Sequence, residues 1–182
     1  MILVTGGCRS GKSAHAQQLA ESLAPRRLYV ATAEASDEAM RQRIERHRQA
    51  RDATWATLEL PAGMGYRREP FDAGDFARFF SGHVPQGGVL LFDCLTLWVA
   101  GIMYHGAGEK VVCALGAALF SALGSLGCPV VVVSNEVGLG GIAATRAGRE
   151  FCDAAGMVNQ LAASVSERVV FVVSGVPVTI KG

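Results

Sequence analysis

Short runs of apolar residues, many of them β-branched, recur along the chain and alternate with longer amphipathic segments. The apolar runs cover 1–5, 28–32, 89–93, 130–134 and 169–174. Runs of this kind are typical of strands buried on both faces of a sheet. Helical periodicity covers 12–23, 37–51, 111–126 and 148–167. This alternation predicts an α/β domain with a mainly parallel central sheet.

The C-terminal end of the chain has a different pattern. A turn at 175–177 and a last short apolar run at 178–181 follow the strand expected at 169–174. They predict an antiparallel hairpin at the edge of the sheet. The Gly- and Pro-rich stretch 61–88 is interpreted as a surface excursion with a short helix around 76–80. We therefore expect a single domain over 1–182, a length within the usual range for one domain.

Composition and charge narrow the classes of function. Half the residues are apolar, 18% are charged and the net charge is +1, so we expect neither extended disorder nor a nucleic-acid surface. The five cysteines form no C-x-x-C pair, which disfavours a disulfide framework and a zinc site. With no leader pattern and no apolar run of about 18–20 residues, we expect a cytoplasmic protein that is not membrane-embedded.

A phosphate-binding motif follows the first apolar run directly. Residues 6–13 read G-x-x-x-x-G-K-S and precede an Ala-rich helical segment. Gly6 and Gly11 allow backbone conformations that turn successive N–H groups toward phosphate oxygens. Lys12 is expected to reach the β- and γ-phosphates, and the Ser13 hydroxyl to bind Mg²⁺. The alternative is a chance Gly-rich turn. The motif and its context predict a P-loop made of Gly6, Gly7, Cys8, Arg9, Ser10, Gly11, Lys12 and Ser13.

Two further carboxylates follow apolar runs. Asp93 ends the run 89–93, at the edge of a parallel sheet where ligands bind. We expect it to hold Mg²⁺ as a Walker-B-like residue, although an Asp there also suits the N-cap of a following helix. Glu136 follows the run 130–134. It fits a base or a partner of magnesium, and equally an exposed loop carboxylate.

The segment 37–51 carries one histidine among arginines. Met40, Ile44 and His47 fall on one helical face, so we expect a buried stripe that His47 extends. The nearby positive charge favours a neutral imidazole, which is a nucleophile, and guanidinium groups suit triphosphate oxygens. This arrangement suits a covalent nucleotidyl–histidine. The alternatives are a structural histidine and a solvated arginine face paired with Glu38 and Glu45. The arginines are Arg43, Arg46, Arg48 and Arg51.

Together with shorter motifs, these residues resemble the bifunctional adenosylcobinamide kinase/adenosylcobinamide-phosphate guanylyltransferase family of cobalamin biosynthesis. The resemblance covers nearly the whole chain. Besides 6–13 and His47, it rests on Y-V-A-T-A at 29–33, D-C-L-T-L-W at 93–98, N-E-V-G at 135–138, N-Q-L-A at 159–162 and V-S-G at 173–175. The sequence departs from the family pattern at Arg46, at 141–143, at Cys152 and in the loop 61–70.

The resemblance implies a RecA-like P-loop NTPase fold, a homotrimer and two reactions. ATP or GTP phosphorylates adenosylcobinamide, and GMP from GTP then passes through guanylylated His47 to adenosylcobinamide phosphate, giving adenosylcobinamide-GDP. Catalysis would use His47 and Lys12. The resemblance also implies nucleotide contacts from Thr32, Ala33, Glu34, Arg48, Gln49, Ala50, Arg51, Glu59 and Asp93.

Two other functions use the same P-loop. One is a monofunctional small-molecule kinase in which His47 is structural, and the other is a nucleotide-dependent switch or binding module without an acceptor substrate. A covalent protein–GMP adduct is expected only for the bifunctional enzyme.

Overall fold

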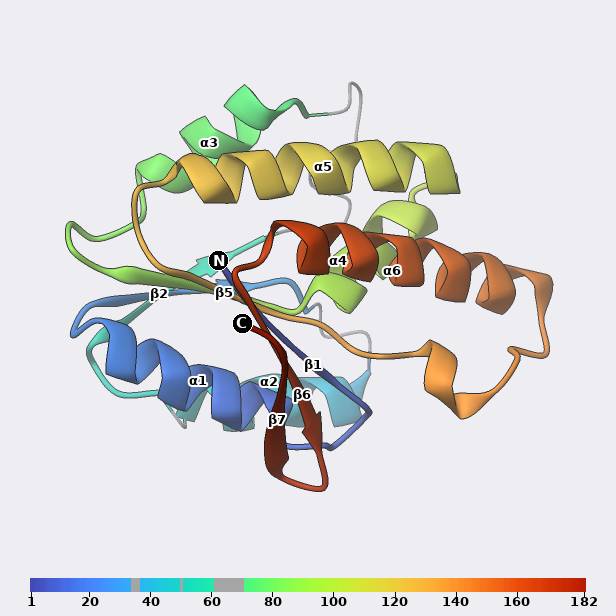
Figure 1. Cartoon of the computed structure of the whole chain (residues 1–182), viewed down its shortest axis with the longest axis horizontal. Coiled ribbons are helices and arrows are strands. Elements are labelled where there is room, and N and C mark those ends of the chain that lie inside the picture. Colours follow the sequence, from blue (N-terminus) through green and yellow to red (C-terminus); the bar gives the residue numbers. More distant parts are fainter. Residues whose placement is uncertain (34–36, 50, 61–70) are drawn as a thin grey trace.

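A seven-stranded sheet forms the centre of the molecule (Figure 1). The computed structural model describes residues 1–33, 37–49, 51–60 and 71–182. The strand order is β3-β2-β4-β5-β1-β6-β7. All neighbouring pairs are parallel except β6 and β7, which pair antiparallel at one edge. The predicted α/β fold and edge hairpin are therefore confirmed. The strands are β1 (Ile2–Gly6), β2 (Arg27–Ala31), β3 (Trp55–Glu59), β4 (Val89–Asp93), β5 (Val130–Val133), β6 (Arg168–Val173) and β7 (Val176–Lys181).

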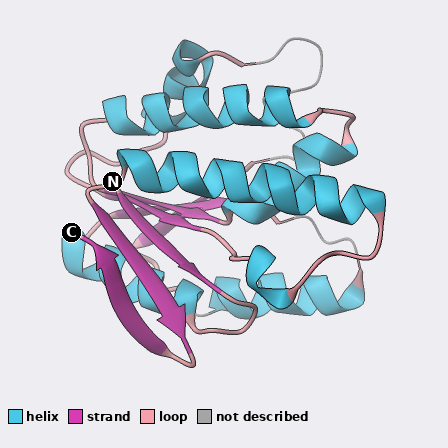
Figure 2. Ribbon diagram, turned by 45° about the vertical axis from the view of Figure 1, so that its right-hand side comes forward, coloured by secondary structure: helices cyan, strands magenta, loops and turns pink. Residues whose placement is uncertain are grey.

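Helices cover both faces of the sheet (Figures 1 and 2). One face packs against α3, α4, α5 and α6, whereas α1 and α2 lie on the other side. Each face of the sheet has its own apolar core, because neighbouring residues of a strand point to opposite faces. Leu90 packs in the core beneath α3, α4, α5 and α6, and Leu91 packs in the core beneath α1. The helices are α1 (Lys12–Leu23), α2 (Glu38–Gln49), α3 (Ala73–Ser81), α4 (Leu95–Tyr104), α5 (Glu109–Ser125) and α6 (Arg146–Val165), and a short 3₁₀ turn covers Gly138–Gly140.

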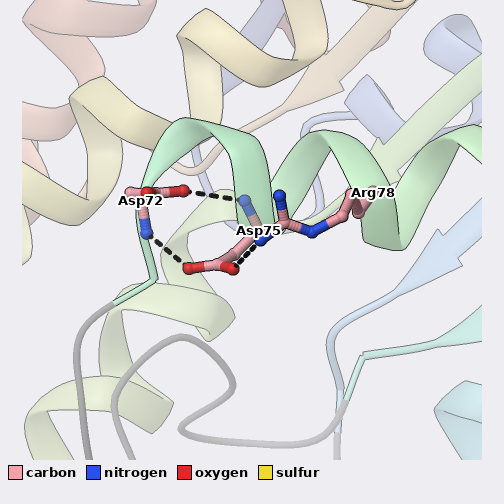
Figure 3. Close-up of polar contacts among 3 residues, drawn as sticks. All are labelled: Asp72, Asp75 and Arg78. Carbon is pink, nitrogen blue, oxygen red and sulfur yellow. Dashed lines mark hydrogen bonds and ion pairs between the residues drawn. The ribbon is translucent and has the colours of Figure 1, made fainter.

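Helix α3 begins with a capping box, drawn in Figure 3. The Asp72 carboxylate accepts a bond of 2.8 Å from the Asp75 backbone N–H, and the Asp75 carboxylate accepts one of 3.1 Å from the Asp72 N–H. Arg78 adds an ion pair with Asp75. This cap fixes the start of a helix whose Phe76 and Phe80 are fully buried. The short helix expected around 76–80 is thus real and longer, while the rest of the expected excursion at 61–70 lies outside the described residues.

The structure contains two elements that the sequence analysis did not predict, β3 and α4, and one turn lies at a different position from the predicted one. Strand β3 pairs with β2 alone and buries only Trp55 fully, so it lacks an apolar run. Helix α4 is apolar nearly all round and shows no helical period. The turn between β6 and β7 lies at Ser174 and Gly175, which have φ angles of 51° and 81°, rather than at 175–177.

Candidate nucleotide-binding site

The P-loop lies between the segment that follows β5 and the turn that joins β6 to β7. Its Gly6 carbonyl accepts a bond of 3.1 Å from the Glu136 N–H, and its Ser10 carbonyl accepts one of 2.8 Å from the Gly175 N–H. A Cβ at Gly6 would lie 2.4 Å from the Val172 carbonyl oxygen. A side chain at this position is therefore excluded by the backbone of β6, and the loop is fixed from both sides.

Lys12 begins α1 directly after a left-handed turn. Gly11 is the N-cap residue with φ 94°, and Arg9 has φ 55°. The Lys12 side chain is only 5% exposed, and its Nζ donates a bond of 3.1 Å to the Gly7 carbonyl. The ammonium group is thereby held over the loop at the N-terminal end of a helix, where phosphate binds.

Two adjoining cavities meet at the P-loop. The first has a volume of about 390 Å³ and reaches from the loop toward β3. The second has a volume of about 890 Å³ and lies between the loop and α2. They share five lining residues, which are Cys8, Lys12, Ser13, Met40 and His47. The phosphate loop and the histidine thus border one continuous space.

Helix α2 supplies the wall opposite the P-loop. Asp37 caps its start, because its Oδ1 accepts a bond of 2.7 Å from the Met40 N–H. Met40, Ile44 and His47 do share a face, but all three are half-buried and line the first cavity. The expected buried stripe is therefore wrong in one respect: it borders the cavity and not the core.

The arginines around His47 divide between the two cavities. Arg48 and Arg51 line the first, and Arg46 lines the second. The alternative, in which these arginines form a solvated face paired with Glu38 and Glu45, is not what the described side chains of Arg46, Arg48 and Arg51 show. Glu38 pairs with Arg41 at 3.4 Å, and Glu45 accepts a bond of 2.9 Å from Gln49. Arg46, Arg48 and Arg51 are accordingly placed to face an anionic ligand.

Asp93 is held by an aromatic side chain from the neighbouring strand. The Tyr29 hydroxyl donates a bond of 2.8 Å to Asp93 Oδ2, and the Arg51 guanidinium lies 3.7 Å above the Tyr29 ring. Burial, and next the Asp93 charge, raise the pKa of Tyr29, so the phenol remains a donor. Asp93 is not a helix N-cap, since Cys94 takes that place in α4. Burial and the Asp93 charge raise the pKa of Cys94 to about 11.

The remaining predicted contacts lie in varied places. Ala33 and Glu59 line the first cavity. Thr32 is 4% exposed, and its hydroxyl bonds both the N–H and the carbonyl of Cys94 at 2.7 and 2.8 Å. Its hydroxyl therefore joins β2 to the end of β4 instead of facing the cavity. Gln49 bonds Glu45 and does not line either cavity. The expected contacts Glu34 and Ala50 lie outside the described residues.

Several lining residues carry no role in the sequence analysis. Tyr29 and Asn135 belong to the Y-V-A-T-A and N-E-V-G motifs, so a signal for them existed. Thr96 and Leu97 belong to the D-C-L-T-L-W motif but lie on a helix that was not expected, and Thr57 lies on the strand that was not expected. All line the first cavity, and these residues are Tyr29, Thr57, Thr96, Leu97 and Asn135.

A family model described as cobinamide kinase / cobinamide phosphate guanyltransferase matches residues 2–180. The chain belongs to this family. It is 37% identical over 180 residues to the bifunctional adenosylcobalamin biosynthesis protein CobP of Pseudomonas aeruginosa, covering 99% of this chain and 96% of the relative. It is also 37% identical over 193 residues to the proteins named CobU of Escherichia coli and Salmonella typhimurium, covering 100% of this chain and 99% of each relative. The family resemblance inferred from the motifs is confirmed.

No helix in the described parts of this cobinamide kinase family member is long and apolar enough to cross a membrane.

Proposed function

We propose that the chain phosphorylates adenosylcobinamide with ATP or GTP and then transfers GMP from GTP to the product, giving adenosylcobinamide-GDP. One observation carries this proposal: His47 and Lys12 both line the two cavities that meet at the P-loop. A triphosphate bound there borders the lysine expected for γ-phosphate transfer and the histidine expected for attack at the α-phosphorus. The family match supports the same pair of reactions.

The kinase step depends mainly on stabilising the negative charge of the phosphate oxygens, and it needs no covalent intermediate on the protein. The substrate hydroxyl oxygen forms a bond to the γ-phosphorus while the bond from that phosphorus to the bridging oxygen breaks and the nucleoside diphosphate leaves. Lys12 and the loop N–H groups lower the energy of the charge on the phosphate oxygens. The Gly7 carbonyl accepts a hydrogen bond from the Lys12 ammonium group and holds it close to the loop.

The guanylyl step uses His47 as the nucleophile. An imidazole nitrogen forms a bond to the α-phosphorus of GTP, and pyrophosphate leaves. An oxygen of adenosylcobinamide phosphate then attacks the same phosphorus, which releases His47 and forms the diphosphate link. Arg46 on one side and Arg48 on the other bring positive charge to the two cavities that His47 borders.

The described residues fit a magnesium ion. Ser13 and Asp93 line the same cavity as Lys12, and a hydroxyl and a carboxylate are the oxygen ligands that Mg²⁺ prefers. The Tyr29 hydroxyl donates a hydrogen bond to Asp93 Oδ2, which fixes the orientation of the carboxylate. When bound, Mg²⁺ supplies charge neutralisation for the phosphates. Ser13 and Asp93 are the residues that would hold it.

We further propose that 1–182 act as one nucleotide-binding transferase domain in a cytoplasmic homotrimer that binds no nucleic acid and is not embedded in a membrane. Self-association is supported by the edge strand β7, which exposes Val176, Val178 and Ile180 at 59%, 47% and 63%. Such an edge invites pairing with another chain. Sedimentation velocity tests the trimer directly, and a monomer at micromolar concentration would contradict it.

Product analysis tests the two reactions separately. The protein is incubated with adenosylcobinamide and ATP, then with GTP, and the corrinoid products are identified by mass spectrometry. We expect the phosphate first and the GDP derivative after GTP. His47→Ala should retain the first product and lose the second. A monofunctional kinase gives the phosphate alone in the wild type, and a binding module gives neither product while still binding nucleotide.

A further inference from the structure

Tyr29 contacts two charged groups of opposite sign in the first cavity. Its hydroxyl donates a bond of 2.8 Å to Asp93 Oδ2, and the Arg51 guanidinium lies 3.7 Å from the centre of its ring. The tyrosine is only 8% exposed, and all three residues line the cavity. One side chain thus holds both a carboxylate and a guanidinium that a ligand in the cavity can reach.

The register of the sheet explains how Tyr29 reaches the end of the neighbouring strand. Partners on adjacent strands point to the same face, so Glu59, Ala31 and Asp93 form a row across β3, β2 and β4. Tyr29 lies two residues before Ala31 and points to the same face of β2. Because Ala31 has only a methyl group, the tyrosine ring can extend past it toward Asp93.

The guanidinium of Arg51 is held without the use of its hydrogen-bond donors. A separation of 3.7 Å is the contact distance of two stacked groups, and a guanidinium that stacks on an aromatic face keeps its N–H groups in its own plane. Among the described residues, the Arg51 side chain forms no ion pair and no hydrogen bond. Its donors therefore remain available to the oxygens of an anionic ligand.

The Asp93 carboxylate is also only partly used. Oδ2 accepts from Tyr29, whereas Oδ1 accepts no hydrogen bond within the part of the chain that the structure describes. Arg51 and Asp93 both lie against the same tyrosine, yet no ion pair joins these two described residues. A guanidinium and a carboxylate readily form a bidentate pair when nothing lies between them. The tyrosine keeps the two charges apart and leaves both for a ligand.

We propose that Tyr29 is a positioning residue of the nucleotide site. Its hydroxyl orients Asp93 for magnesium, while its ring directs Arg51 to a phosphate of the nucleotide and prevents these two charged groups from neutralising each other. Metal binding and nucleotide binding are thereby supported by two separate parts of one side chain. This inference rests on the proposed nucleotide and magnesium site.

Tyr29→Phe tests the hydroxyl alone. The probe is a GTP analogue with a methylene group between the α- and β-phosphorus atoms, which His47 cannot cleave, and its affinity is measured by calorimetry with and without Mg²⁺. We expect the metal-free affinity to stay within about twofold of the wild type, because the ring still holds Arg51. The Mg²⁺ concentration that gives half of the gain in affinity should rise on the order of 10-fold. An unchanged magnesium requirement would overturn the role of the hydroxyl.

Arg51→Lys tests the ring without disturbing the buried tyrosine. The lysine keeps the charge but has no planar group to stack on the ring, so its ammonium group is free to pair with Asp93. We expect the metal-free affinity for the analogue to fall on the order of 10-fold, close to the value for Arg51→Ala. Wild-type affinity in Arg51→Lys would overturn the role of the ring.

Arg41→Lys is the matched control for the arginine replacement. Arg41 lies on α2 in an exposed ion pair with Glu38 and lines neither cavity. This variant should bind the analogue as the wild type does. A loss of affinity in Arg41→Lys equal to that in Arg51→Lys would contradict a specific role for Arg51.

A double-mutant cycle shows whether Tyr29 acts through Arg51. Tyr29→Leu removes the ring and should weaken metal-free binding on the order of 10-fold in the wild-type background, but by less than about twofold in the Arg51→Ala background. Additive effects of Tyr29→Leu and Arg51→Ala would contradict the proposal. Tryptophan fluorescence checks that each variant is folded, and if Tyr29→Leu is not, the result for Arg51→Lys decides the role of the ring.

A wild-type protein that does not bind the analogue, or binds it without any effect of Mg²⁺, would sink the proposed site itself. A wild type that binds with a magnesium effect, together with variants that match it, would sink only this inference.

Discussion

Tyr29→Phe removes one hydroxyl and nothing else from the site. The ring stays to stack under Arg51 and to meet Trp55 edge-on, but the 2.8 Å bond to Asp93 is lost. A hydrogen bond to a charged group is worth about 1.5–3 kcal/mol. Asp93 is half-buried and lines the cavity, so water can solvate the carboxylate in the variant. This places the expected loss at the lower end, about 1.5 kcal/mol.

Urea unfolding in metal-free buffer, followed by tryptophan fluorescence, measures the difference. For a chain of this length the loss corresponds to a fall in Tm of about 3–6 °C. Tyr104→Phe is the matched control, since the same hydroxyl is removed from a side chain that is 88% exposed, and it should leave stability unchanged. If Tyr29→Phe costs no more than Tyr104→Phe, the bond does not stabilise the fold and Asp93 is not held by it.

Three further predictions concern the loop and α1. Lys12→Ala should lower phosphorylation turnover on the order of 10²-fold by removing charge from the developing transition state, and unchanged turnover in a steady-state assay would exclude the proposed role. Gly6→Ala should destabilise the chain by about 1–3 kcal/mol in urea unfolding because its Cβ overlaps the Val172 carbonyl, whereas a Cβ at Gly7 meets nothing within 4 Å; equal stability of Gly6→Ala and Gly7→Ala would contradict this. Burial, and next the charge of Arg168, lower the pKa of His15 from its usual 6.5, so the unfolded chain binds the proton more readily. Stability from this residue is present above pH 6.5 and is lost as the pH falls below it, and His15→Gln should flatten that acid-side loss in unfolding measured at several pH values. The same slope in both proteins would contradict the assignment.

The regular parts of the fold could be predicted because each has a strong local signal. The helical segment expected at 12–23 and the strand expected at 89–93 coincide with α1 and β4, because the P-loop motif precedes the first and the second is a continuous apolar run that ends at an aspartate. Strand β3 escaped prediction because it is paired on one side only and is mostly exposed. Helix α4 escaped because a helix buried on nearly every side has no amphipathic period.

The site could be predicted as far as its residues follow one another in sequence. The P-loop is a contiguous motif, and the strand-edge rule brought Asp93 to the same edge. The bond from Tyr29 to Asp93 joins residues 64 positions apart, and the bonds that link Thr96, Asn135 and Asn159 join three segments, so neither has a local pattern. Periodicity placed Met40, Ile44 and His47 on one face, but whether that face meets core or cavity depends on how α2 packs.

The central claim is that His47 carries GMP between GTP and the corrinoid substrate. It is tested most directly by incubating the protein with GTP labelled at the α-phosphate and locating the label on the chain. We expect acid-labile, alkali-stable label on His47, which adenosylcobinamide phosphate removes and which is absent from His47→Ala. An unlabelled wild type, or undiminished label in His47→Ala, would contradict it.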